Sequence, residues 1–161
     1  MNQVAKRKNK TNKNLFWLNI LIVFAVIFLD RITKLLVLNL NNNLKLFSFL
    51  EIIFVKNEGI VFGLFSNNNL NNIFIITSII SLIIILTFYR YAKNSPVTYF
   101  LSMILGGAIG NIIDRIRYGY VIDFIKVDSF YVFNIADASI TVGTILLIIY
   151  ILFYEKEFRI I

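Results

Sequence analysis

The chain has 161 residues, of which 58% are hydrophobic, and it carries a net charge of +7. Because it contains no cysteine and no histidine, it has no disulfides, cysteine nucleophiles or Ser-His-Asp triads and lacks the usual zinc ligands. The length suits one domain, and its chemistry must use carboxylates, amides, hydroxyls, Lys or Arg.

Four long apolar runs contain no Asp, Glu, Lys or Arg, and a membrane-spanning helix needs about 20 mostly apolar residues. The first run is slightly short, so its helix is expected to continue past Asp30, and the second is long enough to be trimmed. We therefore predict an all-α membrane protein, a single integral membrane domain over residues 1–161, with a small β-rich extracytoplasmic surface segment. The four transmembrane helices are expected at about 15–36, 70–89, 96–113 and 138–154.

The basic excess is confined to one side of this arrangement. It lies in residues 1–13, in the link between the second and third spans and in the tail, whereas the charges of the other two connections cancel. The positive-inside rule makes the basic side cytoplasmic, so both termini are expected there. A nucleic-acid-binding protein has no reason to segregate charge in this way, so we predict a membrane partner and no nucleic acid.

Residues 1–13 are expected to be a disordered, basic lead-in that helps to set orientation. Together with Leu15–Leu29 they also resemble a signal peptide. However, no small-residue cleavage pattern follows, and a helical register continues through LDRITK, so an uncleaved first span is favoured. Asp30 and Lys34 stand four residues apart and can pair on a helix, either as an interfacial salt bridge or as part of a site.

Residues 39–66 form the first external segment. They are rich in aromatic and β-branched residues and are interrupted by Asn57-Glu58-Gly59. This pattern predicts short strands that meet at a turn on the bilayer surface. An apolar external loop of this size is suited to lining a groove for a hydrophobic ligand.

Gly106 and Gly110 give the third predicted span a GxxxG pattern near its end. The pattern lets another helix approach closely. Packing within the chain is favoured over dimerisation.

The stretch from Gly110 to Thr141 holds four of the nine acidic residues, between long apolar runs. A charge at mid-bilayer costs roughly 2.5–3.5 kcal/mol on insertion scales, so such acids are functional candidates. On helices, Asn111 shares a face with Asp114, and Asn134 shares one with Asp137. Asp123 lies in YVIDFIKV, whose alternation predicts a strand or an extended segment.

Two carboxylates in a poorly hydrated site cannot both ionise easily, so one pKa rises and the pair holds one proton. The ionised partner can then take a proton from water while the other donates to a carbonyl oxygen. Asn amides can orient such a pair, and Arg can anchor a carbonyl or neutralise Asp114. Alternatively, all of these acids are interfacial charges paired with Arg115, Arg117 and Lys126. Spacing alone does not choose among the possible acid pairs.

Five blocks of the sequence carry a resemblance to a known family. It resembles the lipoprotein signal peptidases, the type II signal peptidases of bacterial inner membranes. The matching blocks are LDRITK at Leu29–Lys34, NEGIVFGLF at Asn57–Phe65, GNIIDR at Gly110–Arg115, GYVIDFI at Gly119–Ile125 and FNIADASITVG at Phe133–Gly143.

The resemblance implies an aspartic endopeptidase that cuts the signal peptide from prolipoproteins just before a diacylglyceryl-modified cysteine. It implies prolipoprotein substrates, membrane lipid and globomycin-type inhibitors as partners, no cofactor, no metal, and an active site on the extracytoplasmic side of the bacterial inner membrane. It assigns the catalytic pair to Asp123 and Asp137. The residues around the substrate or the pair are Asn57, Gly59, Asn111, Arg115 and Asn134, and the structural support comes from Asp30, Lys34 and Asp114, of which Asp114 is the main rival for catalysis.

Two positions depart from the family pattern. Arg31 stands where the family usually has Gln, and Ile60-Val61 replace the usual pair of alanines after the Asn-x-Gly turn. We expect both departures to affect groove shape and substrate preference more than the reaction.

Two other classes of function compete with the protease. A small ion-coupled transporter would use the acids as a proton relay, but it should place an acid near mid-span, and here the acids cluster at the outer ends. A noncatalytic membrane scaffold is the third reading. Flux without proteolysis would favour the transporter, and Asp-to-Asn changes that affect only assembly would favour the scaffold.

Overall fold

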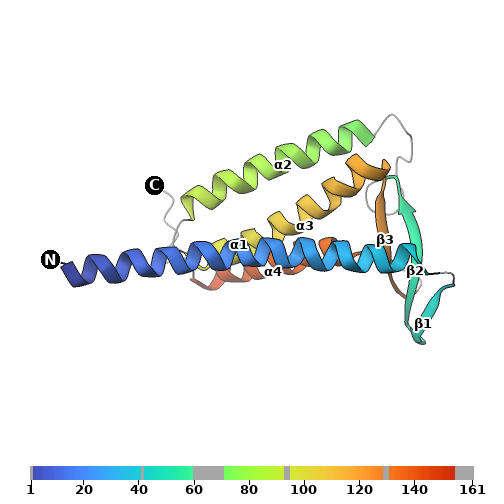
Figure 1. The fold of residues 1–161 in the computed structure, drawn as a ribbon, viewed down its shortest axis with the longest axis horizontal. Coiled ribbons are helices and arrows are strands. Elements are labelled where there is room, and N and C mark those ends of the chain that lie inside the picture. Colours follow the sequence, from blue (N-terminus) through green and yellow to red (C-terminus); the bar gives the residue numbers. More distant parts are fainter. Residues whose placement is uncertain (1, 41, 60–70, 93–94, 129–130, 155–161) are drawn as a thin grey trace.

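The computed structural model describes residues 2–40, 42–59, 71–92, 95–128 and 131–154. A bundle of helices carries a four-stranded sheet at one end, the end farthest from the start of the first helix (Figure 1). In chain order the elements are α1 (Asn2–Leu38), β1 (Leu44–Phe47), β2 (Leu50–Asn57), α2 (Asn71–Tyr91), α3 (Val97–Tyr118), β3 (Val121–Val127), β4 (Tyr131–Phe133) and α4 (Ile135–Tyr154).

Three helices of the described chain are long and apolar enough to cross a membrane, namely Asn72–Tyr91, Val97–Tyr118 and Ile135–Phe153. They match the spans predicted at 70–89, 96–113 and 138–154. The span predicted at 15–36 falls inside α1, which is not among these three. The protein is therefore mostly helical, with three candidate spans and a small antiparallel sheet.

The helix ends differ from the predicted ones. The structure extends α3 five residues past 113 to Tyr118, and α4 begins at Ile135 rather than at 138. The charge-free runs stop at Asp114 and Asp137, whereas the helices continue through both because both carboxylates have partners inside the fold. The expectation of a disordered lead-in over 1–13 is wrong, since α1 begins at Asn2. Residues 1–38 contain neither Gly nor Pro, so nothing in them breaks a helix.

The predicted β-rich segment is confirmed, but it joins two distant parts of the chain. The sheet has the order β1-β2-β3-β4, and all neighbours are antiparallel. β1 and β2 form a hairpin in which Phe47 pairs with Leu50. Asn57 ends β2, and its side-chain oxygen accepts a hydrogen bond from the Gly59 N–H at 3.1 Å. The strand expected beyond this turn lies outside the described residues.

The first half of β3 is covered on both faces. Val121, Ile122, Asp123 and Phe124 are all buried, whereas a strand on a surface exposes every second residue. β2 lies beside this half, with Val55 opposite Asp123 in the register. Asp123 is therefore held inside the structure, at a position where β3 pairs with β2.

Glycines let α3 lie close to two other helices. A Cβ atom added at Gly106 would lie 2.9 Å from Cβ of Val26 in α1. One added at Gly107 would lie 2.4 Å from the backbone oxygen of Ala136 in α4. One added at Gly110, the second glycine of the GxxxG pattern, would lie 2.9 Å from Asp30 Oδ2 in α1, so the pattern is used inside the chain, as predicted.

A buried polar cluster joins α1 to α3 nearer the other end of the bundle. The Asn19 amide donates to the Thr98 hydroxyl at 3.1 Å, and the Ser102 hydroxyl donates to the Asn19 side-chain oxygen at 3.2 Å. Side chains of this kind hold helices together where no water competes for the hydrogen bonds. They set the position of α1 along α3.

We predict that Gly107→Ala destabilises the fold. The new methyl would press on backbone rather than on a movable side chain, and overpacking of this kind costs about 1–3 kcal/mol. The measurement is the thermal midpoint of the purified protein in detergent. Ile116→Ala on the same helix is the control, because Ile116 is 69% exposed. Equal midpoints for the two variants would contradict the close approach of α3 and α4.

Candidate active site

Polar residues from five elements meet where the bundle joins the sheet. Most of them are buried, although they lie among apolar helices and strands. The structure connects the predicted site residues through hydrogen bonds and ion pairs that run between α1, β2, α3, β3 and α4, and these residues are Asp30, Lys34, Asn57, Asn111, Asp114, Asp123, Asn134 and Asp137.

Asp123 is held by two amides. Its Oδ2 accepts from Asn57 Nδ2 at 2.8 Å, and its Oδ1 accepts from Asn134 Nδ2 at 2.7 Å. The residue is 1% exposed. Because β2 carries Asn57 beside β3, the pairing of the two strands also fixes the amide that orients this carboxylate.

Asp137 lies in the first turn of α4. Its Oδ1 accepts from Asn111 Nδ2 at 2.7 Å, and its backbone N–H donates to Asn134 Oδ1 at 2.8 Å. Asn134 therefore caps the N-terminus of α4, where Asn is among the preferred residues. A carboxylate in this turn is also favoured by the helix dipole.

One side chain joins the two acids. The oxygen of Asn134 accepts the Asp137 N–H, while its amide donates to Asp123 and also lies 3.2 Å from Asn111 Oδ1. Asn111 in turn donates to Asp137. Asp123 and Asp137 thus belong to one closed network, although they are 14 residues apart in the chain.

The environment raises the pKa of Asp123 to about 7. Burial is the main cause, and the negative charge of Asp137 adds to it. The bonds from Asn57 and Asn134 and the charge of Lys34 oppose the rise. Burial also raises the pKa of Tyr131 on β4, with smaller contributions from Asp137 and Asp123. Because of burial and of the neighbouring negative charge, Asp123 keeps its proton to a higher pH than an ordinary aspartate does.

A second pair of carboxylates next to the first is fully matched by cations. Asp30 and Asp114 are both 0% exposed. Lys34 Nζ lies 3.0 Å from Asp30 and 2.7 Å from Asp114, and Arg31 lies 2.6 Å from each. The i,i+4 pairing of Asp30 with Lys34 is confirmed. Asp114 is paired with Lys34 and Arg31 from α1, and Arg115 of its own helix is also within electrostatic reach.

Arg115 and Gly59 lie beside this network. The Arg115 guanidinium stands 5.7 Å from the ring centre of Phe74 and is within electrostatic reach of Asp137 and Asp123. Gly59 is buried and bonds to Asn57, which holds Asp123. The Ile60-Val61 departure lies outside the described residues.

Sequence reasoning underestimated one residue. Arg31 was expected to affect groove shape and substrate preference more than the reaction, yet it bonds to Asp30, to Asp114 and to the Gly110 carbonyl oxygen. The available signal was its place in LDRITK, where Arg31 directly follows Asp30 and adds a second cation to Lys34.

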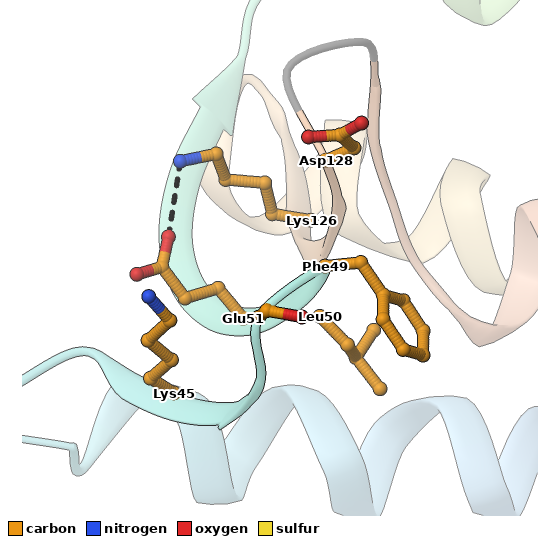
Figure 2. Close-up of a pocket in the computed structure, with 7 residues that line it drawn as sticks. Lys45, Phe49, Leu50, Glu51, Lys126 and Asp128 are labelled. Carbon is orange, nitrogen blue, oxygen red and sulfur yellow. Dashed lines mark hydrogen bonds and ion pairs between the residues drawn. The ribbon is translucent and has the colours of Figure 1, made fainter.

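A separate hydrophilic pocket lies farther along the sheet, with a volume of about 210 Å³. Figure 2 shows Lys126 bonded to Glu51, with Lys45 on the far side of Glu51. No residue predicted for the site lines this pocket. The candidate site is therefore the network around Asp123 and Asp137. A pair of carboxyl groups in such a setting can activate water without a covalent intermediate.

Comparison with known proteins identifies a family. A model of the family described as signal peptidase (SPase) II matches residues 22–153. A lipoprotein signal peptidase of Caldanaerobacter subterraneus is 42% identical, over 80% of this chain and 91% of that protein. One of Pelagibacter ubique is 39% identical, over 92% of this chain and 96% of that protein.

Solved structures agree with this. A bacterial membrane enzyme solved by the in meso method at 2.3 Å resolution superposes with a TM-score of 0.78 and 33% identity, covering 89% of this chain and 92% of the other. A second, at 1.9 Å, gives a TM-score of 0.74 and 34% identity, with coverage of 84% and 92%. The chain is a multi-pass membrane protein and belongs to the signal peptidase II family.

Proposed function

We propose that this protein is a membrane aspartic endopeptidase that removes the signal peptide from diacylglyceryl-modified bacterial prolipoproteins. Family membership supports the peptidase and its class of substrate. The observation that carries the mechanism is the closed network of Asn134, which holds Asp123 and the first turn of α4 together.

In this mechanism the pair of Asp123 and Asp137 holds one proton. The ionised carboxylate removes a proton from a water molecule, and that water attacks the carbonyl carbon of the scissile peptide bond. The protonated carboxyl donates its proton to the carbonyl oxygen, and the resulting tetrahedral intermediate collapses as the leaving nitrogen is protonated.

The surrounding side chains orient the pair and the substrate. Asn57, Asn111 and Asn134 fix the carboxylate oxygens. Little reorganisation is therefore needed when the ionised carboxylate removes a proton from the water. In this proposal Arg115, which lies against Phe74 of α2, anchors a substrate carbonyl, and the Asn57–Gly59 turn borders the pair on the side of β2. Asp30, Lys34 and Asp114 support the pair from α1 and α3.

The setting is the inner membrane of a bacterium. We propose four spans, with the first inside α1, both termini in the cytoplasm and the site on the extracytoplasmic side. The charge-free runs and the one-sided basic excess support this orientation. Reporter fusions placed after residues 40, 92 and 128 check it, and a cytoplasmic signal after residue 40 or 128 would reverse it.

We predict that Asp123→Asn and Asp137→Asn each lower the rate of signal-peptide removal by about 100- to 10,000-fold, because each variant removes one half of the acid–base pair. The assay uses the purified protein and a diacylglyceryl-modified prolipopeptide. Globomycin should block the wild-type reaction, as the resemblance to the family implies.

The matched control is Asp128→Asn. Asp128 is exposed and has a positive φ of 52°, a conformation that Asn adopts readily. The control should cleave at the wild-type rate. If Asp123→Asn or Asp137→Asn cleaved as fast as this control, the assignment of the pair would be wrong.

We also predict that the rate of cleavage falls as the pH rises above about 7. The pKa of Asp123 is raised to about 7, and the mechanism needs one proton on the pair. Above that pH the protonated, active fraction of the enzyme therefore falls about tenfold with each pH unit. Initial rates between pH 5 and 9 measure this alkaline limb. A rate that stays level to pH 9 would show that the shared proton is not needed.

A further inference from the structure

Arg31 makes three bonds with one planar group. Its Nη1 donates to Asp114 at 2.6 Å, and its Nη2 donates to Asp30 at 2.6 Å and to the Gly110 carbonyl oxygen at 2.9 Å. It therefore ties α1 to α3 at the level of the candidate active site. A flat guanidinium can hold two carboxylates in fixed directions, which the point charge of a lysine cannot do.

The two carboxylates that Arg31 holds have a common second role. Asp114 Oδ2 accepts the backbone N–H of Ile122 at 3.1 Å, and Asp30 Oδ1 accepts the backbone N–H of Ala136 at 3.1 Å. Ile122 directly precedes Asp123, and Ala136 directly precedes Asp137. Each buried carboxylate thus clamps the backbone immediately before one member of the pair.

Charge explains why the second cation matters. Asp30 and Asp114 carry two negative charges, and Lys34 and Arg31 together balance them. Lys34 alone would leave one negative charge uncompensated in a buried site, next to a pair of acids that must itself release a proton. A buried carboxylate without its partner is strongly disfavoured and tends to bind a proton instead. A protonated carboxyl can no longer accept at every oxygen, so its clamp on the backbone would loosen.

We propose that Arg31 is a positioning residue for the Asp123–Asp137 pair, which it fixes in place and keeps electrostatically isolated through Asp30 and Asp114. This inference rests on the proposed function, because it takes those two acids as the reacting groups. In this chain the two cations and the two carboxylates together make the support electrically neutral.

The pair is also faced by charged and titratable groups other than Arg31. The groups with a direct electrostatic effect on the pair, or from it, are Asp30 and Lys34 from α1, Arg115 from α3 and Tyr131 from β4, and all of them contribute to the pH dependence. None of these is changed in the test, so a shift on replacing Arg31 reports the supporting charges alone.

The test compares Arg31→Gln and Arg31→Lys with the wild type in the prolipopeptide assay. Arg31→Gln should lower kcat by roughly 10- to 100-fold, the effect of a small misplacement of reacting groups, with KM within about twofold. It should also move the alkaline limb of the pH profile upward by roughly half a pH unit or more, because removing a cation favours the protonated acid. Arg31→Lys should keep the wild-type limb but lose part of kcat, since it keeps the charge and loses the planar fork.

Hydrogen–deuterium exchange gives a readout that does not depend on activity. Peptides that contain Ile122 and Ala136 should exchange faster in Arg31→Gln, because both backbone clamps weaken. The control is Lys126→Gln, which removes the same charge from the half-exposed pair with Glu51. It should leave kcat, the alkaline limb and both exchange rates at wild-type values.

A wild-type kcat and a wild-type alkaline limb in Arg31→Gln would overturn the inference. If Arg31→Gln does not fold, Arg31→Lys decides, and a wild-type kcat with unchanged exchange at both amides overturns it. The proposed function fails in a different way, through normal cleavage by Asp123→Asn or Asp137→Asn. Faster exchange at both amides with slower cleavage in the Arg31 variants supports the inference.

Discussion

Four carboxylates lie in or next to one buried region, and the need to compensate their charge organises the structure around them. Burying an ionised carboxylate is costly unless ion pairs and hydrogen bonds replace the lost water. Here Lys34 and Arg31 supply the ion pairs, and Asn57, Asn111 and Asn134 supply most of the hydrogen bonds. The helices, the glycines of α3 and the sheet bring these partners within reach of one another.

The compensation is unequal, and this inequality separates two kinds of acid. Asp30 and Asp114 have cations at 3.0 Å or less, so they serve as fixed acceptors for backbone N–H groups. Asp123 has amides instead of cations, and its pKa rises to about 7. Amides orient a carboxylate without cancelling its charge. The same residue type can therefore be a fixed acceptor at one position and have a raised pKa at another position of the same buried region.

Much of the fold could be predicted from the sequence, because long charge-free runs leave few alternatives in a membrane. The strand around Asp123 followed from alternation, but the hairpin turn after Phe47 did not. That turn uses Ser48 and Phe49, and neither is a Gly, Pro or Asn, the residues by which a turn is most readily recognised. The turn that the sequence did indicate, at Asn57, lies at the other end of β2. Spacing placed the acids at the helix ends without choosing among them; the choice of Asp123 and Asp137 came from family resemblance. The contacts of Arg31 with α3 were missed because they depend on how α1 packs against α3, which no pattern within a single segment of the sequence shows.

The order in which the chain is made bears on when these charges can pair. Arg31 and Lys34 precede Asp114, the carboxylate that they share, by 83 and 80 residues. While the chain is being synthesised, these two cations of α1 therefore have only Asp30 as a partner from this set. Their charges are balanced only after α3 has been made and has packed against α1.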